Sequence, residues 1–123
     1  MAPPNLHASR ARPLHAHERR LIEGVAEVLP GALAAQLRTD IDRAMAVDEG
    51  GSHVEFVLAD HARPTPLGEH PYPVDIEVTD ADGEALTVIL SADERDRLLQ
   101  MEIIRWDDDP VIAPKWDEVM FAT

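Results

Sequence analysis

Histidines and carboxylates are the residues of this sequence that could hold a metal ion. His61 and His70 lie in one proline-rich stretch, with Asp60 before them and Glu69 between them. A loop could bring the two imidazoles and a carboxylate together, and such a set suits zinc or non-haem iron. The spacing follows no metal signature such as HExxH. We therefore expect solvent-facing histidines and predict no metal and no cofactor, with a small metal-binding enzyme or sensor as the alternative.

Two acidic runs could also bind a cation. Calcium loops of the EF-hand type need glycine at position six, whereas Gly83 is fourth in the run Asp80-Ala81-Asp82-Gly83-Glu84. A hairpin turn explains this run better. Asp107, Asp108 and Asp109 are consecutive, and neighbouring side chains of a strand point to opposite faces, which makes a poor chelate. Within an acidic patch they could instead imitate nucleic-acid phosphates and enter the cleft of a nuclease or deaminase.

Nucleophilic catalysis has no sequence support. The three serines, Ser9, Ser52 and Ser91, lie outside any GxSxG motif, and the chain has no cysteine. A glycine-rich phosphate-binding loop and a dinucleotide fingerprint are also absent from the sequence. We predict no catalytic residue and a protein that is not an enzyme.

The net charge of −13 is unevenly placed. Residues 41–123 carry six Lys or Arg against twenty Asp or Glu, so the acidity belongs to the C-terminal two thirds. Nucleic-acid binding needs clustered basic residues, and we predict none. An acidic face gives solubility and can also steer a basic protein partner. No apolar run is long enough to span a membrane and no secretory signal is visible, so we expect a cytoplasmic protein without membrane contact.

The elements that must position these residues begin with helices. Residues 1–13 read as a flexible tail and residues 14–123 as a single domain. An apolar stripe with helical period predicts a helix over His15–Leu29, in which Gly24 would permit close packing. A second, shorter helix begins over Ala32–Arg38. Residues 41–48 fit both periods, and the Gly-Gly turn after them favours a strand.

Strands dominate the rest of the chain. Strict alternation predicts strands over residues 54–58, 74–78, 86–90 and 99–103, and the last three form a meander. The stretch 61–73 is a proline-rich connection. Apolar residues near the C-terminus are expected to pack back through a helical turn at Lys115–Met120. We predict an α+β fold, with two N-terminal helices packed on one face of an antiparallel meander sheet of about five strands.

The second face of this sheet is the predicted interaction surface. By alternation it carries Asp75, Glu77, Thr87, Gln100 and Glu102, so it is polar and acidic. The residues predicted to bind a partner are Asp75, Glu77, Glu102, Trp106, Asp107, Asp108 and Asp109. The oligomeric state is left open.

Several segments resemble a bacterial family. They are Pro13-Leu14-His15-Ala16-His17-Glu18-Arg19, Gln36-Leu37, the turn Asp48-Glu49-Gly50-Gly51-Ser52, the Asp80–Gly83 hairpin and the strand from Leu98 to Asp107. Together they resemble a small bacterial domain of unknown function over residues 13 to 112, some members of which lie near polymorphic-toxin genes, as immunity proteins do.

The resemblance implies a strand over residues 41–48 and a toxin-neutralising role. The function expected from it is that of a non-enzymatic, immunity-like protein that binds a cognate bacterial toxin and occludes its basic active-site cleft. A structural or adaptor module, which would associate through the sheet edge or the tail Trp116–Phe121, is a further alternative to the metal-binding one.

Overall fold

Two helices form the first regular elements of the described chain. The computed structural model describes residues 10–123. Helix α2 spans Ala16–Val28 and helix α3 spans Gly31–Arg43. Glu18 closes the N-terminus of α2, because its carboxylate accepts the backbone N–H of His15 at 2.7 Å. Neither helix of the described residues has the length and apolar character needed to cross a bilayer.

The strands form one antiparallel sheet. They are β1 (Ala44–Asp48), β2 (His53–Leu58), β3 (His70–Pro71), β4 (Asp75–Thr79), β5 (Ala85–Ala92), β6 (Leu98–Arg105) and β7 (Met120–Ala122). The sheet order is β1-β2-β6-β5-β4-β7, and β3 pairs with the end of β5. The α+β prediction is confirmed. The sheet has seven strands rather than about five because β3 and β7 are too short to show an alternation.

Residues 41–48, whose sequence fits both a helix and a strand, form the end of a helix and the strand that follows it. Helix α3 continues to Arg43, and strand β1 begins at Ala44. The strand prediction is therefore correct for 44–48 and wrong for 41–43. Ile41 is buried as part of the helical stripe, which keeps the helix going for one more turn.

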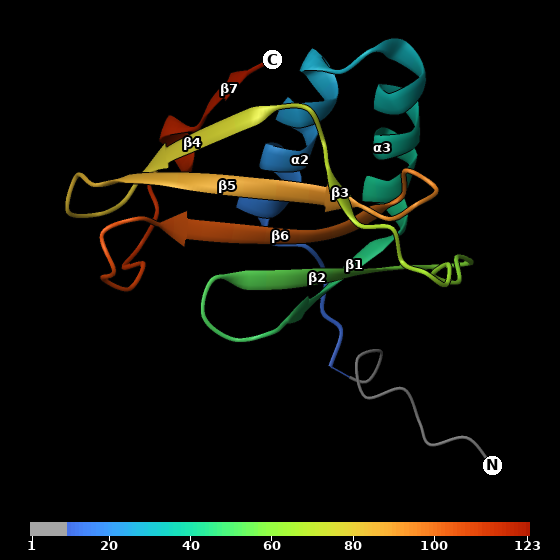
Figure 1. Ribbon diagram of the computed structural model, residues 1–123, viewed down its shortest axis with the longest axis horizontal. Coiled ribbons are helices and arrows are strands. Elements are labelled where there is room, and N and C mark those ends of the chain that lie inside the picture. Colours follow the sequence, from blue (N-terminus) through green and yellow to red (C-terminus); the bar gives the residue numbers. More distant parts are fainter. Residues whose placement is uncertain (1–9) are drawn as a thin grey trace.

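Both helices cover the same face of the sheet, as Figure 1 shows. The core lies between the two helices and the sheet, where apolar helix residues pack on the buried side chains of β4, β5 and β6. The residues predicted to point inward are buried: Leu21, Ile22, Val25, Leu29 and Leu37. Leu33 is partly buried. Neither helix of residues 10–123 lies on the opposite face, and we call it the helix-free face.

The N-terminal segment is anchored within the described residues. Of the predicted tail 1–13, residues 1–9 lie outside the part that the structure describes. Arg12 exchanges two backbone hydrogen bonds with Ala46 of β1, at 2.8 and 2.7 Å. Its guanidinium also binds the carboxylates of Glu18 and Asp48. A residue ahead of the first helix thus pairs with the outer edge of β1.

The end of the chain, residues 111–123, returns to the domain, and we call it the C-terminal strap. The predicted helical turn is present as a 3₁₀ turn at Trp116–Glu118. The Trp116 ring stacks on His17 with 4.6 Å between ring centres. Strand β7 then pairs with β4, and Phe121 packs on the core. This segment is an edge of the sheet rather than a free tail.

Candidate partner-binding site

The helix-free face brings together four of the residues predicted to bind a partner. Asp75 and Glu77 are exposed on β4, while Ile76 and Val78 beside them are buried in the core. Across β5, Glu102 is exposed on β6 and pairs with Ile89. The alternation of each strand therefore places these acids on the same side of the sheet.

Trp106 lies at the end of this acidic row. It follows β6, and its side chain is 71% exposed. The indole N–H donates to the hydroxyl of Thr87 at 3.0 Å. Thr87 lies between the buried Leu86 and Val88, so it points to the helix-free face. The hydrogen bond fixes one end of a large apolar ring on the side of the sheet that carries the acids, and we call Asp75, Glu77, Glu102 and Trp106 the acidic face.

A groove of about 750 Å³ opens on the same side of the sheet. Its walls are β4, β5, β7 and the segment Pro71–Val74. No residue of either helix lines it, which places it on the helix-free face. Its lining combines apolar side chains, including Ile89 and Met120, with the carboxylates of Asp75 and Glu77. This volume is in the range of cavities that bury a large side chain or a small ligand.

The run Asp107–Asp109 forms a turn rather than a strand end. Asp108 has a φ of +68°, a left-handed conformation that few side chains adopt. Asp107 accepts the backbone N–H of Asp109 at 3.1 Å. The three carboxylates therefore do not share one direction. All three residues are exposed, but Asp107 is held by hydrogen bonds from Arg105, and the carboxylate of Asp109 lies 3.9 Å from the same guanidinium.

Arg105 is the group that holds Asp107. Its guanidinium makes two hydrogen bonds to Asp107, at 2.8 and 2.9 Å, and two to Asp82, at 3.0 and 2.7 Å. A fifth contact, at 2.8 Å, reaches Asp80. Bidentate pairs of this kind are strong and directional. The guanidinium lowers the pKa of Asp107 and that of Asp82.

Asp80 connects the β4–β5 hairpin to the C-terminal strap. Its buried carboxylate accepts the backbone N–H groups of Ile112 and Ala113, at 2.9 and 2.8 Å. Burial opposes ionisation, but these donors, the N–H of Ala81 and Arg105 outweigh it and lower the pKa of Asp80 to about 2. The acidic β4–β5 hairpin thus has a structural role, in which Asp80 holds the C-terminal strap and Arg105 in place.

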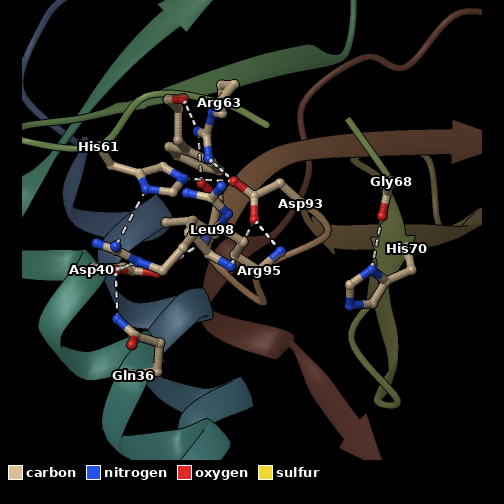
Figure 2. A network of polar contacts seen from close by, with 11 residues as sticks. Gln36, Asp40, His61, Arg63, Gly68, His70, Asp93, Arg95 and Leu98 are labelled. Carbon is tan, nitrogen blue, oxygen red and sulfur yellow. Dashed lines mark hydrogen bonds and ion pairs between the residues drawn. The ribbon is translucent and has the colours of Figure 1, made fainter. Parts of the chain in front are cut away.

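A second group of buried charges lies at the other end of the sheet, between α3 and the 61–63 segment (Figure 2). Asp40 of α3 accepts from Arg97 Nε at 2.8 Å and from the backbone N–H of Leu98 at 2.9 Å. Gln36 donates to the same carboxylate at 3.1 Å. All of these donors converge on a side chain with no solvent exposure, so the charge is paired where water cannot reach it.

Asp93 is the second buried carboxylate of this network. It accepts from His61 Nε2 at 2.7 Å and from Arg63 at 3.1 Å. Arg97 Nη1 lies 3.4 Å from the other ring nitrogen of His61. An arginine nitrogen can only donate, so His61 Nδ1 is the acceptor and Nε2 carries the proton. Both ring nitrogens are therefore occupied, and His61 offers none to a metal or a substrate.

The loop histidines do not form the metal site considered as an alternative. His70 lies apart from His61 in Figure 2 and binds the carbonyl of Gly68 and the carboxylate of Asp96. The Gly68 carbonyl is the main cause of a raised pKa at His70, with Asp96 second. Among residues 10–123 no group of three His, Asp or Glu side chains is arranged to hold a metal ion.

The groove and the buried network were both missed by sequence reasoning. One signal for the groove was available, because Ile89 is an apolar residue on the polar face of an otherwise alternating strand. The network had no local signal, since Asp40 and Arg97 are 57 residues apart.

Comparison with known protein families gives a match over most of the chain. The profile of a domain of unknown function (DUF6984) matches residues 11–115. No curated protein and no solved structure matches the chain. The matched range ends within the C-terminal strap, before the 3₁₀ turn and β7. The β7 wall of the groove therefore lies outside the range that the family profile describes.

Proposed function

The chain belongs to the family of the domain of unknown function DUF6984. We propose that it is a non-enzymatic protein that binds and neutralises a cognate bacterial toxin. The family description assigns no activity, so the proposal is supported by the chemistry of the helix-free face. One observation carries it: Asp75, Glu77 and Glu102 share that face with the exposed ring of Trp106.

This combination suits a basic protein surface. Carboxylates on a face steer a partner of opposite charge and raise the rate of encounter. Tryptophan is enriched among the few residues that dominate binding energy, and Trp106 is mostly exposed in the free protein. The expected mechanism is occlusion, in which the acids pair with Lys and Arg around the toxin's active-site cleft while the ring covers its apolar rim.

A contrast within the chain supports a binding role over a catalytic one. The side chain of His61 is only 7% exposed, and its two ring nitrogens contact Asp93 and Arg97. The buried carboxylates Asp40 and Asp93 are likewise saturated by donors of the chain itself. These groups hold the fold together, whereas the carboxylates of the acidic face are turned outward.

The test is co-expression with the protein encoded by the adjacent upstream gene. If that neighbour is toxic, the full chain should rescue growth and co-purify with it. Glu102→Lys should weaken both effects, because it places a cation where a basic partner docks. Glu27→Lys is the matched control, since Glu27 is an exposed acid of α2, the helix that covers the opposite face of the sheet. A harmless neighbour, or a toxic one that is neither neutralised nor bound, would refute the proposal.

A further inference from the structure

The groove on the helix-free face is lined by apolar side chains and by carboxylates. Ile89 of β5 pairs with Glu102 of β6, and β4 on the other side of β5 carries the exposed Asp75 and Glu77, so an apolar side chain lies between strands that carry acids. Pro71 and Pro73 contribute further apolar surface at one end. A groove of about 750 Å³ with such a lining can bury an aromatic ring.

The C-terminal strap supplies the outer wall. Met120 of β7 is 60% exposed and lines the groove. Its neighbour Phe121 points the other way, against Gly24 of α2, and this contact holds β7 in place. Pairing of Met120 with Glu77 of β4 sets the methionine beside a carboxylate. Methionine adapts its shape readily to an apolar partner, which suits a wall that receives a side chain.

Charge at the groove selects the kind of segment that enters. Asp75 and Glu77 line it, and no Lys, Arg or His of the described residues does. The guanidinium of Arg105 is already surrounded by Asp80, Asp82 and Asp107, so it does not neutralise these carboxylates. An apolar side chain entering here therefore meets carboxylates that no cation of residues 10–123 neutralises.

We propose that this groove receives an aromatic side chain that is flanked by lysine or arginine in an exposed segment of the partner protein. The ring would contact Ile89, Met120 and the prolines, and the flanking cations would pair with Asp75 and Glu77. The inference rests on the proposed function in that the partner is a basic protein, and it adds the chemistry of the segment that anchors it.

Three end-blocked peptides added to the full chain test this chemistry: Lys-Trp-Lys, Glu-Trp-Glu and Lys-Ala-Lys. Backbone amide shifts followed by NMR should saturate with Lys-Trp-Lys and should concentrate at Thr87, Ile89 and Met120. Affinity for so small a probe should be on the order of millimolar, and the other two peptides should bind at least about tenfold more weakly. Equal responses to all three, or shifts centred elsewhere, would overturn the proposal.

A pair of methionine variants places the binding site. Met120→Lys puts a cation in the groove wall and should reduce Lys-Trp-Lys affinity at least about tenfold. Met45→Lys is the control, because Met45 is also an exposed methionine, on β1 at the opposite end of the sheet order. It should leave the affinity unchanged. Equal losses in the two folded variants would count against the groove.

The outcomes separate this inference from the proposed function. Selective Lys-Trp-Lys binding by a chain that neutralises no neighbouring toxin would support the groove chemistry and refute the toxin role. Neutralisation that is lost in Glu102→Lys but unaffected by Met120→Lys, with no preference among the peptides, would support the toxin role and refute the groove chemistry.

Discussion

Phe121 occupies the space that a side chain at Gly24 would need. A Cβ atom at position 24 would lie 2.6 Å from Cε2 of Phe121 and 3.1 Å from Cε1. The absence of a side chain in the middle of α2 thus lets β7 close on the helix. The expectation of close packing at Gly24 is confirmed, and the partner is a residue of the C-terminal strap.

Gly24→Ala should lower the free energy of unfolding, against the usual trend in helices. Alanine favours a helix interior by about 1 kcal/mol over glycine. Overpacking a tight contact costs about 1 to 3 kcal/mol, and backing away from the new methyl group would disturb the pairing of β7 with β4. Urea unfolding should show a net loss of about 1 kcal/mol.

Two further variants identify the cause of that loss. Gly31→Ala adds a methyl group at the start of α3, where no described atom outside its chain neighbours and the local helix backbone lies within 4 Å, and it should cost nothing. Phe121→Leu should cost less in the Gly24→Ala background than alone. A Gly24→Ala protein as stable as the parent would mean that Phe121 and α2 are not in this contact.

Asp40→Ala should be among the most destabilising single changes in the chain. The substitution leaves Arg97 and the Leu98 N–H without their shared acceptor in a site with no solvent exposure. Removing one partner of a buried ion pair costs about 3 to 5 kcal/mol. The measurement is again equilibrium unfolding in urea, with far-ultraviolet circular dichroism as the probe.

Asp42→Ala is the matched control for this prediction. Asp42 also lies on α3 and pairs with an arginine, Arg19, at 2.9 Å, but its side chain is 72% exposed. Exposed pairs contribute at most about 1 kcal/mol. Similar losses for the two variants would show that the Asp40 network is no more protected from water than a surface pair.

Asp80→Asn should remove part of the acid sensitivity of the fold. The pKa of Asp80 is lowered from 3.8 to about 2 by its backbone donors and Arg105, against the effect of burial. A lowered folded-state pKa contributes stability that is present above pH 3.8 and is lost as the pH falls toward 2. The variant should be less stable at pH 7 and should lose less between pH 4 and pH 2.

Thermal unfolding at several pH values gives this comparison directly. Asp75→Asn serves as the control for the loss of one carboxylate, because Asp75 is an exposed residue of the acidic face that makes none of the contacts of Asp80. Parallel curves for Asp80→Asn and the parent would show that ionisation of Asp80 is not coupled to folding.

Much of the fold could be predicted because the apolar residues recur with a clear helical or strand period over long segments of the sequence. The helical stripe of α2 and the alternation of β4 and β5 extend over enough residues to decide between helix and strand. The same alternation placed Asp75, Glu77 and Glu102 on one face, as observed. At residues 41–43 both periods fit, and burial of Ile41 against the core decided for helix.

The remaining features depend on contacts between distant parts of the chain. The Arg105 cluster joins residues of the β4–β5 hairpin to the end of β6, and the bond of Trp106 to Thr87 spans 19 residues. Strand β7 has three residues, too few to show a period. No local pattern encodes such contacts, so the groove wall and the buried charges required the three-dimensional structure.

Tyr72 offers a test of the core at alkaline pH, because it is the single tyrosine of the sequence. Its hydroxyl is buried and has no hydrogen-bond partner among the described residues. Burial raises the pKa of the phenol, and the negative charges of Asp40, Asp96 and Asp93 raise it further. The tyrosinate absorbance band should therefore stay absent at its ordinary pKa of 10 while the chain is folded.

The same shift predicts how stability depends on pH above that point. A raised folded-state pKa means that the contribution of the buried neutral phenol is complete below pH 10 and is lost as the pH rises beyond it. Tyr72→Phe should remove this alkaline loss and change the free energy of unfolding at pH 7 by less than about 1 kcal/mol, since no hydrogen bond is broken. Tyrosinate absorbance that rises at pH 10 in a chain whose circular dichroism is still native would contradict the burial of this hydroxyl.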